Sequence, residues 1–91
     1  MRTYLIGYDL PKEPVAEYEN LIQAIKSQFP AWWHGLDSTW IVKADLSAAD
    51  VRDRLLRHIR HGDRLLVAQL CGDVVWSGFE EQTRSWLSNN L

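Results

Sequence analysis

Asp9 is the residue whose type and position most readily suggest chemistry. It follows the mostly apolar residues 3–8, whose Tyr, Leu and Ile content predicts a strand buried on at least one face, and Pro11 stops any continuation. A carboxylate at the end of a core strand is costly to desolvate unless something pairs with it. Asp9 is therefore a candidate functional residue. The alternative is that it only accepts backbone N–H groups in a turn.

An arginine-rich stretch over residues 52–64 is the second candidate. Because a helix turns by about 100° per residue, part of this stretch would lie opposite the apolar side of a helix. This basic face consists of Arg54, Arg57, Arg60 and His61. Guanidinium groups suit bidentate contacts with phosphates, so the face could bind nucleic acid. The alternative is a solvated surface with ion pairs at i,i+4 spacing, Asp50 with Arg54 and Asp53 with Arg57.

Other residues that could do chemistry give weaker signals. His58 and His61 are three residues apart, a spacing that can ligate a metal, but no matching cysteine or carboxylate pattern accompanies them. The sequence contains no glycine-rich phosphate loop, HExxH pattern or nucleophile elbow. Cys71 is the single cysteine, which excludes an intrachain disulfide, and we expect it to be a small buried hydrophobe.

The apolar pattern of the first half predicts a strand at about 3–9, a helix at 15–28 and two short strands within 31–44. The helix carries an apolar stripe at three- and four-residue spacing, formed by Val15, Tyr18, Leu21, Ile22, Ile25 and Phe29. β-Branched and aromatic residues dominate the two strands, which are joined by a tight connection near Asp37 and Ser38. Adjacent side chains in a strand point to opposite faces, so Trp32 and Trp33 cannot enter the same core.

A second helix is predicted between Ser47 and Gly62. Ser47 and Asp50 resemble a capping box, and Gly62 suits the position just past the helix end. Residues 64–70 then predict a strand that is nearly continuous in apolar residues, as is typical of a central strand covered on both faces.

The C-terminal part predicts a short fifth strand at 74–76 and a helix over about 79–88, opened by a second capping box from Ser77 to Glu80. The resulting element order is β-α-β-β-α-β with additions, which is the ferredoxin-like arrangement. We expect a four-stranded antiparallel sheet with two helices on one face. The other face is then left for a partner, and in so small a chain that is often a second copy.

Length and composition point to a single domain over residues 1–91, with its core at about 1–76. The chain is 46% hydrophobic and 24% charged, which excludes disorder. A net charge of −2 and a pI of about 5.8 exclude a strongly basic DNA-coating protein, so any nucleic-acid contact must be a local patch. No signal peptide or apolar run near 18 residues occurs, so we expect a cytoplasmic protein without a membrane partner.

The order of elements and several short motifs resemble the Cas-two superfamily, the small ferredoxin-like CRISPR-associated proteins of prokaryotes, and in particular a branch called SinR-like. The resemblance covers residues 1–76, mostly as topology. Its sharpest points are Tyr8-Asp9 at the end of the first strand and Ser38-Thr39-Trp40, which is similar to the family's serine-valine-aromatic stretch. The segment 44–47 before the second helix is also similar.

The resemblance implies a homodimer in which Asp9 faces its symmetry mate across a two-fold axis. The two carboxylates would hold one Mg²⁺ or Mn²⁺, with Ser38 as a hydrogen-bonding neighbour. Two carboxylates with waters and a phosphate oxygen form an adequate site for such a hard cation, whereas one carboxylate does not. A metal there would stabilise charge at a scissile phosphate and help to generate hydroxide, which implies a metal-dependent endonuclease acting on RNA or DNA.

A second class of function stays open, a non-catalytic dimeric protein-interaction module with the same fold. In that case Asp9 is a turn residue, the tryptophans form the dimer and the C-terminal helix docks a protein partner. The net negative charge favours this module, whereas the placement of Tyr8-Asp9 favours the nuclease.

Overall fold

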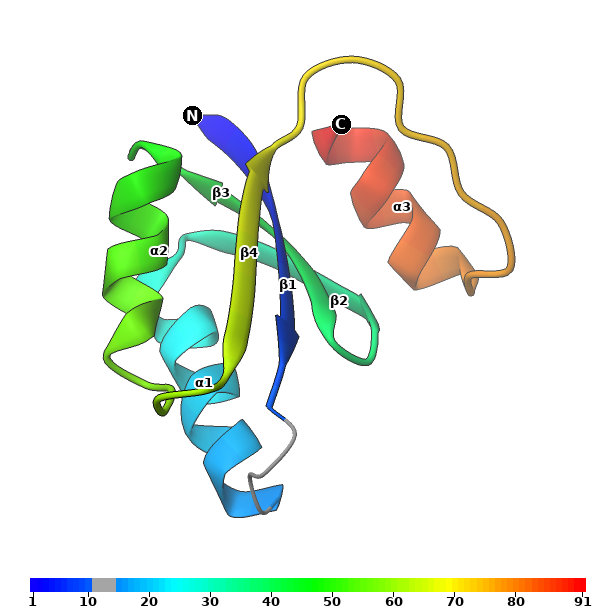
Figure 1. Cartoon of the computed structure of the whole chain (residues 1–91). Coiled ribbons are helices and arrows are strands. Elements are labelled where there is room, and N and C mark those ends of the chain that lie inside the picture. The colour runs from blue at the N-terminus through cyan, green and yellow to red at the C-terminus, as the bar shows by residue number, and fades with distance from the viewer. Residues whose placement is uncertain (11–14) are drawn as a thin grey trace.

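Four antiparallel strands and three helices make up the fold of the residues that the structure describes. The computed structural model describes residues 1–10 and 15–91, and the side chains of these except at 15–18. The elements are β1 (Arg2–Asp9), α1 (Val15–Gln28), β2 (Ala31–Leu36), β3 (Thr39–Ala44), α2 (Ala48–Leu56), β4 (Arg64–Gln69) and α3 (Glu81–Asn90). The strands lie in the order β2-β3-β1-β4, and every neighbouring pair is antiparallel (Figure 1). The predicted ferredoxin-like arrangement is confirmed.

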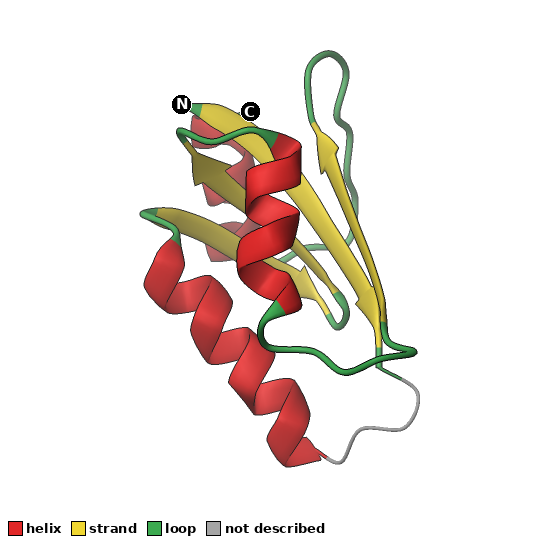
Figure 2. Cartoon of the chain, turned by 60° about the vertical axis from the view of Figure 1, so that its left-hand side comes forward, coloured by secondary structure: helices red, strands yellow, loops and turns green. Residues whose placement is uncertain are grey.

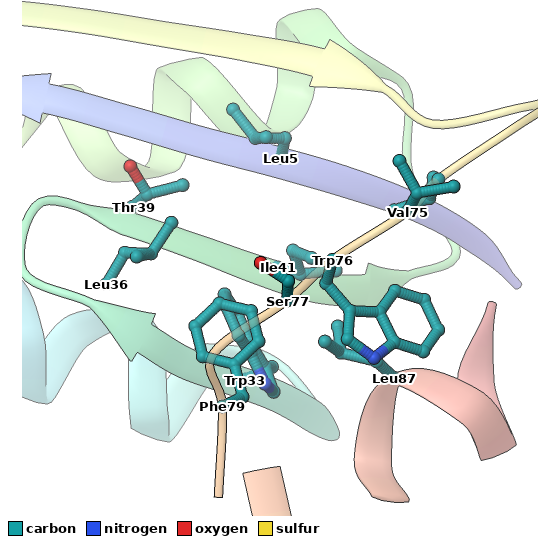
Figure 3. A pocket seen from close by; sticks show the side chains of 11 residues that line it. Leu5, Trp33, Leu36, Thr39, Ile41, Val75, Trp76, Ser77, Phe79 and Leu87 are labelled. Atoms are coloured by element: carbon teal, nitrogen blue, oxygen red, sulfur yellow. The ribbon is translucent and has the colours of Figure 1, made fainter. Parts of the chain in front are cut away.

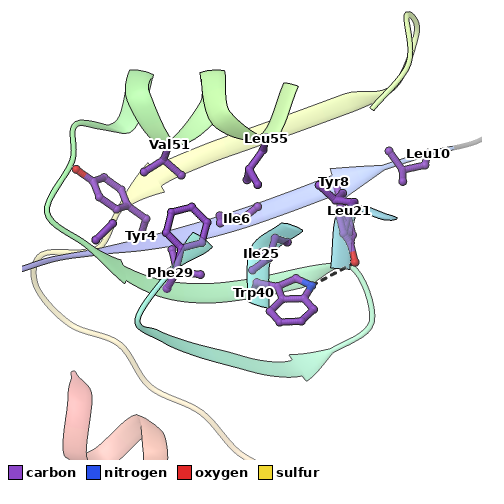
Figure 4. Packing of buried hydrophobic residues seen from close by; sticks show 12 residues of the cluster. Tyr4, Ile6, Tyr8, Leu10, Leu21, Ile25, Phe29, Trp40, Val51 and Leu55 are labelled. Carbon is purple, nitrogen blue, oxygen red and sulfur yellow. Dashed lines mark hydrogen bonds between the residues drawn. The ribbon is translucent and has the colours of Figure 1, made fainter. Parts of the chain in front are cut away.

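The main core lies between the sheet and the helices α1 and α2, which cover one face (Figure 2). Side chains alternate along β1, so that Tyr4, Ile6 and Tyr8 are buried in this core while the residues between them face the other side. The predicted stripe on α1 is confirmed for Leu21 and Ile25, which pack into the same core (Figure 4). Phe29 and Ile22 also contact it, whereas the side chains of Val15 and Tyr18 lie outside the described residues.

The C-terminal helix α3 packs on the opposite face of the sheet, over β2 and β3 (Figure 1). A second hydrophobic cluster forms there around Trp33, Ile41 and Leu87. The indole Nε1 of Trp33 donates a hydrogen bond of 3.1 Å to the carbonyl of Thr83, which ties α3 to β2. Trp32 lies on the other side of β2 with its ring 5.5 Å from that of Trp40, so the two adjacent tryptophans point to opposite faces as predicted.

Three predictions about the C-terminal part are wrong. Residues 74–76 do not form a fifth strand, because they run across the second face of the sheet without pairing to either outer strand. The last helix begins at Glu81 with Glu80 as its N-cap, and no side chain closes the cap, so the capping box expected at Ser77 does not form. Cys71 is exposed rather than buried, since it lies in the segment that leaves the sheet after β4.

Two predictions about the second helix and fourth strand also need correction. Ser47 caps α2 as expected, accepting the N–H of Asp50 at 3.1 Å, but the helix already ends at Leu56. The carboxylate of Asp63 accepts the backbone N–H of Arg60 at 2.7 Å and draws these residues into a turn, which competes with helix continuation. β4 is an outer strand and not a central one. The helix α3 packs over β2 and β3 and not over β4, so Leu66 on that face of β4 remains 60% exposed.

Candidate functional site

Asp9 is placed by the pairing of β1 with β4. It lies exposed at the end of β1, directly opposite Arg64, the first residue of β4. Residues opposite each other in an antiparallel pair project to the same face of the sheet, so the carboxylate and the guanidinium share the face that α1 and α2 leave free. No ion pair joins the two side chains within the described part of the chain. Both groups are therefore available to a ligand.

A short chain of hydrogen bonds fixes the end of β1 against the connection between β2 and β3. The buried indole Nε1 of Trp40 donates to the hydroxyl of Tyr8 at 3.2 Å, as the dashed line in Figure 4 shows. That hydroxyl in turn donates to the carbonyl of Asp37 at 3.4 Å. The backbone N–H of Tyr8 also donates to the carbonyl of Ser38 at 3.1 Å. These contacts bring Ser38 beside the residue that precedes Asp9, so the two site residues predicted from the sequence lie at the same end of the sheet.

An open hollow of about 380 Å³ surrounds Asp9 on the β1–β4 edge of the sheet. Gly7, Arg64 and Leu66 contribute to its lining. A Cβ atom at Gly7 would meet only a Leu5 methyl group, at 4.0 Å, so there is open space directly above Gly7. The hollow is wide and shallow, with one carboxylate and one guanidinium at its end. Such a surface can accept a large partner close to Asp9.

An apolar groove of about 250 Å³ lies beside this hollow on the same face. Figure 3 shows Leu5, Leu36 and Ile41 on the sheet side, with Trp76 and Phe79 on the segment that crosses it. The groove separates the half of the face that α3 covers from the half that stays open. We call the open half the β1–β4 face, defined by Gly7, Asp9, Arg64, Leu66 and Ala68.

The described residues of one copy do not form a complete site for Mg²⁺ or Mn²⁺. In the part of the chain that the structure describes, no three histidine, cysteine or carboxylate side chains gather in one place. Among the described residues that line the hollow at the end of β1, Asp9 is the only carboxylate. These cations prefer six oxygen ligands, and one carboxylate supplies at most two of them. Asp9 would therefore need further oxygen ligands, such as those of a carboxylate from a second copy.

The predicted basic face is divided by the structure. Arg54 lies on α2 and Arg57 caps its C-terminus, whereas Arg60 and His61 lie in the following turn and not on the helix. This turn leads directly into β4, which begins beside Asp9, so the basic residues and Asp9 lie at the same end of the molecule (Figure 1).

The expected helical ion pairs from Asp50 and Asp53 to the arginines four residues later do not form among the described residues. The ion pair found there joins Arg52 to its neighbour Asp53 at 3.0 Å. Both side chains are more than half exposed, so this pair contributes little to stability.

Arg64 belongs to the arginine-rich stretch but not to the basic face predicted from the sequence. Its position opposite Asp9 was not predicted. Once β1 and β4 are taken as antiparallel neighbours, the first residue of β4 must lie near the last residue of β1. The predicted topology therefore already indicated that Arg64 lies near Asp9, and only the strand register was missing to pair the two residues.

Comparisons with known proteins support the fold alone. No model of a known protein family matches the chain, and no curated protein matches it. Among solved structures, the chain is similar to a hypothetical protein, TT1823, from Thermus thermophilus, with 24% sequence identity and a TM-score of 0.65. The match covers 86% of this chain and 92% of that one. Over the residues described here, no helix is long and apolar enough to cross a membrane.

Proposed function

We propose that two copies of this chain form a nucleic-acid-binding protein of the Cas-two kind, in which the paired Asp9 carboxylates support metal-dependent cleavage of a phosphodiester. The observation that carries the proposal is the position of Asp9 at the end of the uncovered β1–β4 face. If a second copy packs on this open, largely apolar surface about a two-fold axis, its own Asp9 would come close to the first.

The apolar character of the β1–β4 face supports pairing of two copies. Leu66 projects from its centre with 60% of its surface exposed, opposite Gly7, which leaves room above it. Exposed apolar surface of this kind commonly marks an interaction site. The helix α3 covers only the β2–β3 half of the sheet, so it does not obstruct this surface.

Each site residue has a role in the proposal that follows from its chemistry. Asp9 from each copy would ligate Mg²⁺ or Mn²⁺, which when bound neutralises charge on the phosphate and lowers the pKa of a bound water. Ser38 supplies a hydroxyl near the end of β1 that can hydrogen-bond a phosphate oxygen. Arg64 adds a guanidinium on the same face, suited to bidentate phosphate contact. Arg54, Arg57, Arg60 and His61 would hold the strand beyond the site through its phosphates.

The experiment is a binding and cleavage panel on the purified chain. Single- and double-stranded RNA and DNA are incubated with Mg²⁺, Mn²⁺ or EDTA at low salt, where phosphate contacts are strongest. The variants are Asp9→Asn, which keeps the shape of the side chain but loses its charge, and Asp73→Asn as the control. Asp73 is also an exposed aspartate, and it lies in the segment after β4.

The expected result is metal-dependent cleavage that Asp9→Asn abolishes and Asp73→Asn retains, with both variants dimeric and folded by circular dichroism. Binding without cleavage by the wild type would replace the nuclease with a nucleic-acid adaptor. Absence of binding to every substrate at low salt would overturn the nucleic-acid proposal in favour of the protein-interaction module. Loss of the dimer or of the thermal transition in Asp9→Asn would show that Asp9 has a structural role.

A further inference from the structure

The connection between β4 and α3 crosses the apolar groove (Figure 3) without a hydrogen bond to hold it there. We call this connection the strap, residues 71–79. None of its backbone or side-chain groups forms a hydrogen bond with another described residue. All of its residues except Val74 and Phe79 are exposed, so water can satisfy their backbone groups. The strap is therefore held on the sheet by apolar side chains alone.

The two ends of the strap are fixed, and a glycine lies beside each fixed point. Just before the strap, the backbone N–H of Leu70 donates a hydrogen bond of 2.8 Å to a carbonyl of β1. At the far end, the ring of Phe79 meets that of Trp33 edge-on, with centroids 5.2 Å apart. Gly72 and Gly78 lie inside these contacts with positive φ angles of 130° and 86°. Glycine has more conformational freedom than other residues, and a segment with few buried contacts opens at low free-energy cost, so the strap can lift between its ends.

The groove beneath the strap offers no charge to a ligand. Every described side chain that lines it is neutral, and most are apolar. A charged ligand would lose hydration there without gaining a partner, which is costly. The hydroxyl groups of Thr39 and Ser77 belong to the lining and form no hydrogen bond with another described residue. They can therefore bond to one polar group of an uncharged ligand, as donor or as acceptor.

Three aromatic side chains and a small volume limit the ligand further. Trp33, Trp76 and Phe79 line the groove, and the ring of Trp33 is oriented by its hydrogen bond to the carbonyl of Thr83. Aromatic rings favour edge-to-face or offset contacts with another ring. Pockets for drug-sized ligands measure about 300–1,000 Å³. The groove measures about 250 Å³, so its size and lining suit a ligand of one ring or two fused rings.

We propose that the apolar groove binds a small, uncharged aromatic compound and that the strap is the lid of this site. The strap lifts between Gly72 and Gly78, the compound enters between Trp76 and the sheet, and the strap closes over it. Trp76 suits this role because it belongs to the strap, lines the groove and is 36% exposed, so that a ligand can bury more of its ring. The site needs neither Asp9, a metal nor a second copy of the chain. Its failure can therefore be told apart from failure of the proposed nuclease.

The test is a titration of the full chain followed by two-dimensional NMR of the backbone amides and the indole N–H groups. Indole, toluene and N-methylpyridinium are added in separate arms, and the last two have the same shape but differ in charge. The variants are Ser77→Phe, whose ring would occupy the groove, and Ser85→Phe as the control. Ser85 is an exposed serine of α3 that does not line the groove, so both variants make the same chemical change.

We expect indole and toluene to shift the indole N–H signals of Trp33 and Trp76 and the backbone signals of residues 74–79. N-Methylpyridinium should bind about tenfold more weakly than toluene, or weaker still, because its charge gains no partner in the groove. Ser77→Phe should weaken indole binding about tenfold or more, and Ser85→Phe should leave it unchanged.

The absence of these shifts with both neutral compounds would overturn the proposal, and so would equal binding of toluene and N-methylpyridinium. Shifts at Trp33 without any at residues 74–77 would show that the strap is not a lid. An intact indole response in a Ser77→Phe variant that is folded by circular dichroism would place the bound compound outside the groove. The comparison of the three compounds uses the wild type, so it decides the matter even if Ser77→Phe fails to fold.

Discussion

Replacing Tyr8 with phenylalanine tests whether the hydrogen-bond chain next to Asp9 holds this end of the sheet. The substitution removes one hydroxyl and leaves the buried ring in place. It takes away the acceptor of the Trp40 indole at 3.2 Å and the donor to the Asp37 carbonyl at 3.4 Å. The two losses have different weights, because Trp40 is fully buried and Asp37 is exposed.

The magnitude follows from what each former partner can do afterwards. The Asp37 carbonyl can turn to water, and its bond was long, so its loss costs little. The Trp40 indole N–H has no access to water, and an unsatisfied buried donor costs about 1–3 kcal/mol. We therefore expect Tyr8→Phe to lower the free energy of unfolding by about 2 kcal/mol. For a domain of this size, that corresponds to a fall in Tm of about 8–16 °C.

Urea and thermal unfolding followed by far-ultraviolet circular dichroism measure this loss, with wild type and variant compared at the same protein concentration because association changes the apparent stability. A double-mutant cycle with Trp40→Phe isolates the indole-to-hydroxyl bond from the cavity that the smaller ring creates. In the Trp40→Phe background, Tyr8→Phe should cost about 1 kcal/mol less than in the wild type. A cost below about 0.5 kcal/mol in the wild type, or equal costs in both backgrounds, would refute the reasoning.

Three further expectations concern other parts of the chain. Gly35→Ala should lower the free energy of unfolding in urea by about 1–3 kcal/mol, because a Cβ there would lie 2.3 Å from the ring of Trp33, which packs against α3. Gly7→Ala has open space around it and should cost far less, so similar costs for the two variants would contradict this account. Ser47→Ala should lower the stability by about 1 kcal/mol through loss of the α2 cap, and Ser47→Asp should retain most of it; equal losses would exclude a capping role. Cys71 should react with a thiol reagent in the native protein at a rate within roughly tenfold of the urea-unfolded chain, and strong native protection would show that it is covered in solution.

Hydrophobic periodicity was sufficient to predict the elements that form the main core. The apolar residues at 3–9 predict a strand with a buried face, and the three- and four-residue spacing predicts a buried stripe on the first helix. In the structure the two buried surfaces pack into the same core. The cap at Ser47 was predictable as well, because it depends on a side chain and an N–H three residues apart. These features are local or repeat along the chain, which is why one sequence is enough to find them.

The wrong predictions concern residues whose conformation depends on distant partners. Residues 74–76 have strand-forming side chains, but a strand exists only where another strand offers hydrogen bonds, and the chain carries them across the apolar groove instead. The run at 64–70 packs on α2 with one face and leaves the other face open. Its nearly continuous apolar composition does not indicate which face is covered. The proximity of Asp9 to Arg64 likewise required the strand register, which couples residues far apart in sequence.

The two outer strands of the sheet have unequal capacity to accept another strand. The pairing of β2 with β3 is irregular between Trp33 and Leu36. Such an irregularity bends the strand, so the backbone N–H and C=O groups on its outer edge no longer form a regular row that another strand could pair with. β4 pairs with β1 in unbroken register from Gln69 to Arg64, and its six residues include no proline or lysine. A polypeptide that adds to this sheet by backbone hydrogen bonding should therefore extend it beyond β4. Self-association at high concentration or during refolding should begin along that edge.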